Sequence, residues 1–312
     1  MAAVKKAWIF SVIAGLGAVV AVIAALQPEN PVETSYSSLP REEPQKVATH
    51  TVAKLKDRFS RIGYDLNYVV LNDMKVPRIW SDAVPSDMHE IKQADVRKEL
   101  FLQMMLPLVL MANERIERDR ARVVALAAKM KKGTEIAPGD KSWLDRMYVS
   151  YKVKPGKINN LLARVDVVPV SLALAQAAIE SGWGSSRFAR QGNALFGEWT
   201  WNENNKGIVP DSRDEGKTHR IRAFDSPLDS VASYLHNLNT HRAYRELRSI
   251  RALARRQGQM VSGLDLTSGL IRYSEKGGEY VDLLQSVIRT NDLAQYDQAR
   301  LADRQYASAP RA

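Results

Sequence analysis

The chain has 312 residues, of which 45% are hydrophobic and 26% charged, a composition typical of a globular protein with a substantial core. It has no cysteine, which excludes disulfides and thiolate chemistry, and its five histidines lack the spacing of a zinc hydrolase. The formal net charge of +10 fits an anionic polymer or membrane surface as partner, and equally an ordinary solvated basic surface. Phosphate-binding loops and zinc-finger spacings are missing, so the sequence predicts no nucleic-acid partner, no metal site and no cofactor.

The first segment with a clear interpretation is an uncharged apolar run at residues 7–26, directly after Lys5 and Lys6. A helix needs about 20 apolar residues to cross a bilayer core, so residues 1–26 are predicted to be a membrane anchor. An uncleaved anchor is favoured over a signal peptide because the apolar run is long. The basic flank stays in the cytoplasm, which places the rest of the chain on the other side of the membrane. Residues 27–50 are rich in Pro, Glu, Ser and Thr and predict a flexible stalk.

A helical extension is predicted over residues 51–150. Tyr64–Leu71 is expected to be a short strand or extended segment, and the proline in Val76–Trp80 favours an extended chain there. Leu and Met recur at helical spacing through Asp95–Met130, which predicts a long helix. Pro107 lies inside this pattern and is expected to kink or break the helix.

Residues 151–292 are predicted to form a second, functional domain. Pro169 opens an apolar helix that runs to about Glu180, and a polar stretch rich in Asn and Gly follows, read as a β-hairpin or long loop. Ser226 with the following proline predicts a capped helix start. The remaining predicted elements are a short helix at Ser185–Arg190, the hairpin or loop at Trp199–Phe224, three helices near Ala243–Gln257, Ser262–Arg272 and Glu279–Asn291, and a polar tail at 293–312.

Glu180 is the residue with the clearest chemical signal. It lies at the end of an apolar helix, where the helix dipole is negative, and Gly-Trp-Gly follows at once. The dipole and the apolar neighbours both disfavour the charged form, so both raise the pKa of the carboxyl group. A glutamate that stays protonated near neutral pH suits a general acid, and sugar-bond hydrolysis is the common use of such a group beside a tryptophan.

Two elements carry a family resemblance. Glu180–Gly184 reads Glu-Ser-Gly-Trp-Gly, and Gly192–Gly197 reads Gly-Asn-Ala-Leu-Phe-Gly. The two together, at this spacing, resemble the glucosaminidase family of peptidoglycan hydrolases. The resemblance covers residues 165–291, and similarity at 76–80 and 99–110 extends it upstream.

The resemblance implies a mainly α, lysozyme-like helical domain with a small β-hairpin at the cleft, joined here to an N-terminal transmembrane helix and a helical extension. It implies cleavage of the β-1,4 glycosidic bond on the N-acetylglucosamine side of glycan strands. The partners would be peptidoglycan glycan strands and, through residues 7–26, the bacterial inner membrane, with the body in the periplasm.

The resemblance also implies the site residues. Glu180 matches the catalytic acid of the family, and Tyr273 matches a functional tyrosine, although the family's Tyr-Ala-Thr-Asp element reads Tyr-Ser-Glu-Lys here. Family members carry a second acid on the hairpin, for which Asp211, Asp214 and Glu215 are the candidates. Hydrolysis by two carboxylates needs this base or nucleophile.

Five further residues are predicted to bind substrate or shape its subsite. Trp183 either stacks on a sugar or packs beneath Glu180, Phe196 either shapes the subsite or belongs to the core, and Gln176 either binds substrate or orients the acid. The full set is Trp183, Asn193, Phe196, Trp199 and Gln176. Two alternatives stay open: a lytic transglycosylase with a lone catalytic glutamate, and a non-catalytic protein that binds or scaffolds the cell wall.

Overall fold

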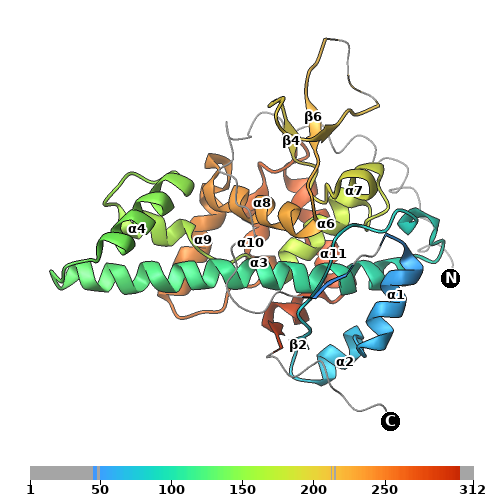
Figure 1. Ribbon diagram of the computed structural model, residues 1–312, viewed down its shortest axis with the longest axis horizontal. Coiled ribbons are helices and arrows are strands. Elements are labelled where there is room, and N and C mark those ends of the chain that lie inside the picture. The colour runs from blue at the N-terminus through green and yellow to red at the C-terminus, as the bar shows by residue number, and fades with distance from the viewer. Residues whose placement is uncertain (1–44, 48–49, 212, 214–215, 303–312) are drawn as a thin grey trace, which may run out of the picture.

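The computed structural model describes residues 45–47, 50–211, 213 and 216–302, and it is mainly helical with a few short strands (Figure 1). The mainly α class predicted from the sequence is therefore confirmed. The predicted anchor at 1–26 and the predicted stalk up to residue 44 lie outside the described residues. Across the part that is described, no helix is both long and apolar enough to cross a membrane.

The N-terminal part combines two short helices with three short strands. Asp65 caps the second helix, because its Oδ1 accepts hydrogen bonds from the backbone N–H groups of Asn67 and Tyr68. The extended segment predicted at 64–71 is therefore wrong, whereas the extended chain predicted at 76–80 is confirmed. The elements are β1 (Gln45–Val47), α1 (Val52–Arg61), α2 (Leu66–Leu71), β2 (Lys75–Val76), β3 (Ile79–Ser81) and the 3₁₀ helix η4 (Met88–Glu90).

The long helix α3 (Ala94–Lys131) spans the molecule (Figure 1). It continues through Pro107, so of the kink or break predicted there, the break is wrong. A proline removes one hydrogen bond of the helix, but here the residues from Phe101 to Asn113 are almost all buried. Their packing against helices α6 (Val170–Ser181) and α8 (Pro227–Thr240) compensates for the missing bond.

Helix α6 lies in the core of the molecule, and its end carries the predicted acid. Its residues from Val170 to Ala178 are all buried, which explains its uniformly apolar sequence. It packs against α3 on one side and against C-terminal elements on the other. Three further helices are near α6 in the sequence. Helices α4 (Pro138–Ser150) and α5 (Ile158–Arg164) precede it, and α7 (Arg187–Gly192) follows it.

A small antiparallel sheet rises above the helices at the top of Figure 1. It consists of β4 (Trp199–Thr200), β5 (Gly207–Ile208) and β6 (Arg220–Arg222), in the order β4-β6-β5. Ile221 lies opposite Trp199 on one side and Ile208 on the other. The hairpin predicted after the second motif is therefore confirmed, with one strand more than a simple hairpin. Ser226 caps α8 as predicted, since its hydroxyl accepts from the Asp229 N–H.

The C-terminal region ends in ordered structure where a polar tail was predicted. Leu293 and Tyr296 are buried in the hydrophobic core, and the last strand pairs in parallel with β2. The tail predicted at 293–312 is thus wrong as far as residue 302, and 303–312 lie outside the described residues. The elements are η5 (Arg242–Tyr244), α9 (Arg245–Arg256), α10 (Gly263–Leu266), η6 (Thr267–Leu270), α11 (Gly278–Thr290), η7 (Leu293–Gln298) and β7 (Arg300–Leu301).

One hydrophobic core extends from Leu55 to Tyr296 and includes residues of the predicted extension and of the predicted second domain. A buried ion cluster adds to this connection. The Asp166 carboxylate, just before α6, lies 2.5 Å from Nη2 of Arg255 on α9 and 3.5 Å from Nη1 of Arg120 on α3. The domain boundaries proposed from the sequence stay predictions.

Candidate active site

Glu180 is the second-to-last residue of α6, and a sharp turn follows it. Gly182, Trp183 and Gly184 all have positive φ angles, of 58°, 58° and 75°. This conformation is unusual for a tryptophan and is typical of glycine. The Ser181 hydroxyl stabilises the turn by accepting a hydrogen bond of 2.9 Å from the Gly184 N–H. The turn ends the helix one residue after Glu180 and leaves its carboxyl group in the last turn of the helix.

Trp183 packs against α3. Its ring meets Phe101 edge-on with centroids 5.8 Å apart, and the Lys98 ammonium lies 5.2 Å from the centre of the ring. A side chain at position 184 would come within 3.0 Å of the Phe101 ring, which explains the glycine there. Trp183 is only partly buried, so the contact with α3 leaves part of its surface accessible.

The surroundings of Glu180 raise its pKa to about 7, mainly through burial, while a hydrogen bond from Tyr280 acts in the opposite direction. Among the described residues, no arginine, lysine or histidine forms an ion pair with it. The raised pKa agrees with the prediction from the sequence. A carboxyl group with this pKa is protonated in a large fraction of molecules at neutral pH and can donate its proton.

A chain of buried hydrogen bonds leads to Glu180. The Tyr280 hydroxyl donates to Glu180 Oε1 at 2.9 Å, and Gln176 Nε2 donates to the Tyr280 oxygen at 3.0 Å. The Tyr234 hydroxyl in turn donates to Gln176 Oε1 at 2.5 Å. Gln176, predicted to bind substrate or to orient the acid, is completely buried and reaches Glu180 only through Tyr280.

Tyr273 and Phe196 belong to the same aromatic cluster as this hydrogen-bond chain. Tyr273 stacks on Tyr280 with centroids 5.3 Å apart, and its hydroxyl donates to the Phe196 carbonyl oxygen at 3.4 Å. The Phe196 ring stacks on Tyr234 at 3.8 Å and is buried. The predicted catalytic tyrosine, Tyr273, therefore stacks on Tyr280, and it is Tyr280 that donates a hydrogen bond to Glu180.

Asn193 connects three parts of the chain. It ends α7 with a φ of 51°, its Oδ1 accepts from the Val84 N–H at 3.1 Å, and its Nδ2 donates to the Phe224 carbonyl at 3.1 Å. Both polar groups of the side chain are thus used within the protein. The predicted role in substrate binding stays a prediction, and the structure gives Asn193 a clear part in positioning the hairpin.

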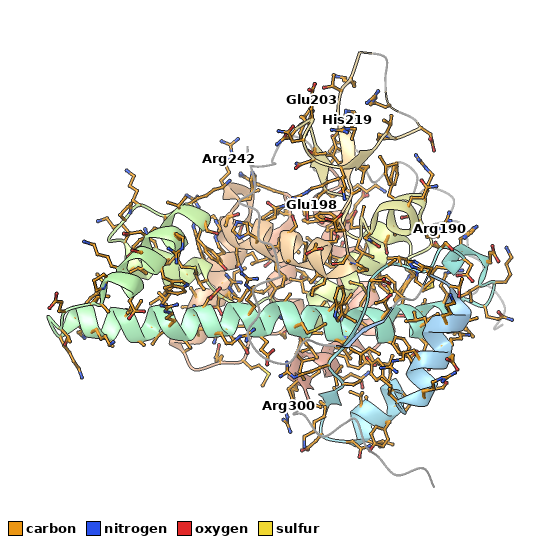
Figure 2. The ribbon with its side chains drawn as sticks, viewed as in Figure 1. Arg190, Glu198, Glu203, His219, Arg242 and Arg300 are labelled. Carbon is orange, nitrogen blue, oxygen red and sulfur yellow. The ribbon has the colours of Figure 1, made fainter. Side chains whose placement is uncertain are left out.

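The sheet carries two accessible tryptophans. Trp199 stacks on His219 with centroids 4.1 Å apart, and Trp201, which is 45% exposed, lies 6.0 Å from Trp199. Flat aromatic surfaces of this kind suit stacking on a sugar ring. Figure 2 shows His219 and Glu203 far out on the sheet, away from the helices.

The three predicted hairpin acids differ in what the structure says of them. Asp211 is 87% exposed and forms an ion pair with Arg187 on α7 at 2.9 Å. Asp214 and Glu215 lie outside the described residues. Among the described hairpin acids, none is brought into contact with Glu180.

No role was predicted for a further acid, Glu198, although it directly follows the second motif. It lies at the base of the sheet (Figure 2) and is 5% exposed. Its Oε2 accepts from the Ser233 hydroxyl at 2.8 Å and lies 3.8 Å from Arg222, while Oε1 has no partner among the described residues. Burial raises the pKa of this carboxyl group. Its position in the sequence, between Phe196-Gly197 and Trp199, is the signal that could have identified it.

Gly197 lies beside the acid and carries no side chain. Its φ is 61°, and a Cβ at this position would lie 4.0 Å from Glu180 Oε2. Oε2 has no hydrogen-bond partner among the described residues, and the Glu180 side chain is partly exposed. One oxygen of the acid is thus held by the protein, and the other faces a position without a side chain. Over the described ranges, no group of three or more His, Cys, Asp or Glu could hold a metal ion.

Comparison with known proteins agrees with this geometry. Residues 157–309 match the glucosaminidase family model, described as mannosyl-glycoprotein endo-beta-N-acetylglucosaminidase. The chain is 34% identical over 217 residues to Protein bax of Escherichia coli (strain K12), covering 68% of this chain and 75% of that protein. No solved structure matches significantly, so the lysozyme-like fold stays a prediction.

The matched region contains Glu180, its tyrosine partners and the sheet, while the similarity to the Escherichia coli protein covers more than two thirds of the chain. A general acid with a raised pKa is one part of glycosidic bond cleavage, and the Glu180 carboxyl group has such a pKa. The chain therefore belongs to the glucosaminidase family and is a glycoside hydrolase.

Proposed function

We propose that this protein cleaves the β-1,4 glycosidic bond on the N-acetylglucosamine side of peptidoglycan strands, with Glu180 as the general acid. The observation that carries the proposal is the environment of Glu180, a carboxyl group with a pKa of about 7 and no cation partner among the described residues. Its Oε2, beside Gly197, would protonate the leaving glycosidic oxygen. Trp199 and Trp201 on the sheet would stack on neighbouring sugars.

The decisive experiment is digestion of purified glycan strands, followed by reduction and analysis of the new chain ends. New N-acetylglucosamine reducing ends support the proposal, and Glu180→Gln serves as the matched inactive variant. New N-acetylmuramic acid ends, or no cleavage, would contradict it.

A lytic transglycosylase is the second candidate, and one observation favours it. Asp211 is paired with Arg187 on α7, so among the described hairpin residues no second carboxylate meets Glu180. In that mechanism the substrate's own group attacks, and no base has to activate water. Anhydro-muramic ends in the same digestion would identify it. Replacing Asp211, Asp214 and Glu215 singly by their amides tests the hydrolytic mechanism, since it predicts a large loss for one of them.

The location of the protein is part of the proposal. Lys5, Lys6 and the apolar run at 7–26 support an anchor in a bacterial inner membrane with the body in the periplasm, where peptidoglycan is accessible. A reporter enzyme fused after residue 50 should be active in the periplasm. Activity of the reporter in the cytoplasm would place the protein on the opposite side of the membrane from its substrate and contradict the proposal.

A further inference from the structure

The hydrogen bonds that lead to Glu180 have a definite direction. A carbonyl oxygen only accepts, so the bond between Tyr234 and Gln176 Oε1 must use the tyrosine proton. The amide nitrogen of Gln176 then faces Tyr280 and donates to its oxygen. Since an amide nitrogen cannot accept, the single proton of Tyr280 goes to Glu180 Oε1.

This direction decides which oxygen of the acid carries the transferable proton. Oε1 accepts the proton of Tyr280, and in a carboxylic acid the carbonyl oxygen is a better acceptor than the hydroxyl oxygen, so a protonated Glu180 holds its own proton on Oε2. Oε2 has no partner among the described residues and lies next to Gly197, where a Cβ would be 4.0 Å from it. We propose that the chain Tyr234–Gln176–Tyr280 positions the proton of Glu180 on Oε2, ready for the leaving oxygen of the glycan. The inference rests on the proposed role of Glu180 as the acid.

The packing keeps this chain in one arrangement. Gln176, Tyr234 and Tyr280 are all at most 1% exposed, so water does not compete for their hydrogen bonds. Stacking fixes the two tyrosine rings, since Phe196 covers Tyr234 and Tyr273 covers Tyr280. Loss of any one bond would leave a buried polar group without a partner, which is costly.

The reverse direction is the physical alternative. If the amide of Gln176 were turned over, its oxygen would accept from Tyr280, and a protonated Glu180 would donate its own proton to the Tyr280 oxygen. The proton would then sit on Oε1 and not on Oε2 beside Gly197. The two arrangements differ in which state of Glu180 is stabilised: a Tyr280 donor favours the ionised carboxylate, and a Tyr280 acceptor favours the protonated acid.

The groups that face Glu180 do not titrate together with it. They are the phenols Tyr234 on α8, Tyr244 on η5, Tyr273 in the turn before α11 and Tyr280 on α11, whose pKa values are all raised above the ordinary value of 10, with burial as the largest cause. These phenols therefore stay protonated while Glu180 titrates near neutral pH. Glu198 acts on Tyr244 together with Glu180 and also has a raised pKa, so Glu198→Gln is used to assign its signal separately.

The experiment compares wild type with Tyr280→Phe and Tyr234→Phe in the whole protein. The Glu180 carboxyl is titrated by carbon-13 NMR, with Glu180→Gln to assign its signal, and kcat and KM on glycan strands are measured across pH. Tyr148→Phe, at a buried tyrosine on α4, is the control. We expect Tyr280→Phe to raise the pKa of Glu180, to move the alkaline limb of kcat/KM upward, and to lower kcat about tenfold with KM unchanged.

Tyr234→Phe should act in the same direction and more weakly, because the Gln176 amide can then adopt both orientations. A lower pKa of Glu180 in Tyr280→Phe would establish the reverse direction and overturn the proposal. An unchanged pKa would also overturn it and leave the chain a purely structural role. If wild type cleaves no glycan, the proposed function fails, while the NMR titration still decides where the proton of Glu180 lies.

Discussion

Two carboxylates lie near the two ends of α6, and the charges around them are opposite in kind: one has cationic partners and the other has none among the described residues. Asp166, just before the helix, is 2% exposed and surrounded by three arginines: Arg255 at 2.5 Å, Arg120 at 3.5 Å and Arg251 at 3.7 Å. Glu180, at the other end, has a tyrosine hydroxyl as its partner and no ion pair among the described residues. The comparison shows that two carboxylates removed from bulk water can have opposite electrostatic surroundings.

The partners of a desolvated carboxylate determine which of its two charge states is favoured. Cations beside Asp166 balance its charge, and the cluster joins α3 and α9 to the start of α6. Without cations, burial of Glu180 favours the protonated form, which is the form a general acid needs. Glu198 is intermediate, with one arginine at 3.8 Å and one unpartnered oxygen. Replacing each of the carboxylates Glu180 and Asp166 by its amide tests this difference.

The largest expected effect is on activity at Glu180. Glutamine has the same shape and can still accept the hydrogen bond from Tyr280, but it cannot donate a carboxyl proton. We expect Glu180→Gln to lower kcat on glycan strands by about 10²–10⁴-fold. The free energy of unfolding at neutral pH should not fall, because no buried ion pair is lost. If the variant were inactive because it is unfolded, the midpoint of its urea unfolding would be lower than that of wild type.

The corresponding change at the other end of α6 should affect stability. Asp166→Asn removes the negative charge and leaves Arg251, which is 1% exposed, without its counter-ion. We expect a loss of about 3–5 kcal/mol in the free energy of unfolding, measured by urea titration at pH 7. The folded fraction should keep its kcat. An unchanged urea midpoint would contradict the structural role assigned to the arginine cluster.

The comparison also predicts an effect of pH on stability. The pKa of Glu180 is raised from 4.5 to about 7 on folding, so between these values the folded protein holds a proton that the unfolded chain has lost. The contribution of Glu180 to stability is therefore complete below pH 4.5 and is lost as pH rises through 7. By linkage this amounts to roughly 3 kcal/mol.

Glu180→Gln should remove that dependence. The difference in unfolding free energy between the variant and wild type should increase in favour of the variant from pH 5 to pH 8, as measured by urea titration at several pH values. A difference that stays constant with pH would show that Glu180 has an ordinary pKa in the folded protein.

Much of this site could be predicted from the sequence, because its main signals are local. The end of an apolar helix, the following Gly-Trp-Gly turn and the second motif are short patterns. They indicated the family and singled out Glu180, whose role as the acid stays a prediction. The cap of α8 at Ser226 was predicted for the same reason, since a capping residue acts within one helical turn.

The parts that escaped prediction depend on contacts between distant segments. Tyr280 reaches Glu180 across 100 positions of the sequence, and Gln176 meets Tyr234 across 58. Pro107 continues α3 because surrounding helices bury that turn, and the polar segment after residue 292 folds because Leu293 and Tyr296 reach the core. In each case tertiary packing outweighed the local preference.

The smallest expected effect concerns the exposed acid of the sheet, which completes the comparison. Asp211 is 87% exposed and paired with Arg187, so solvent screens the pair and its contribution to stability should be below about 1 kcal/mol. Asp211→Asn should unfold at nearly the urea midpoint of wild type and cleave glycan strands at a nearly normal rate, because the carboxylate is engaged away from Glu180. Arg187→Ala is the matched control, since it breaks the same pair and keeps the acid. A loss of kcat in Asp211→Asn comparable to that of Glu180→Gln, with Arg187→Ala unaffected, would instead identify Asp211 as the second carboxylate of a hydrolytic mechanism.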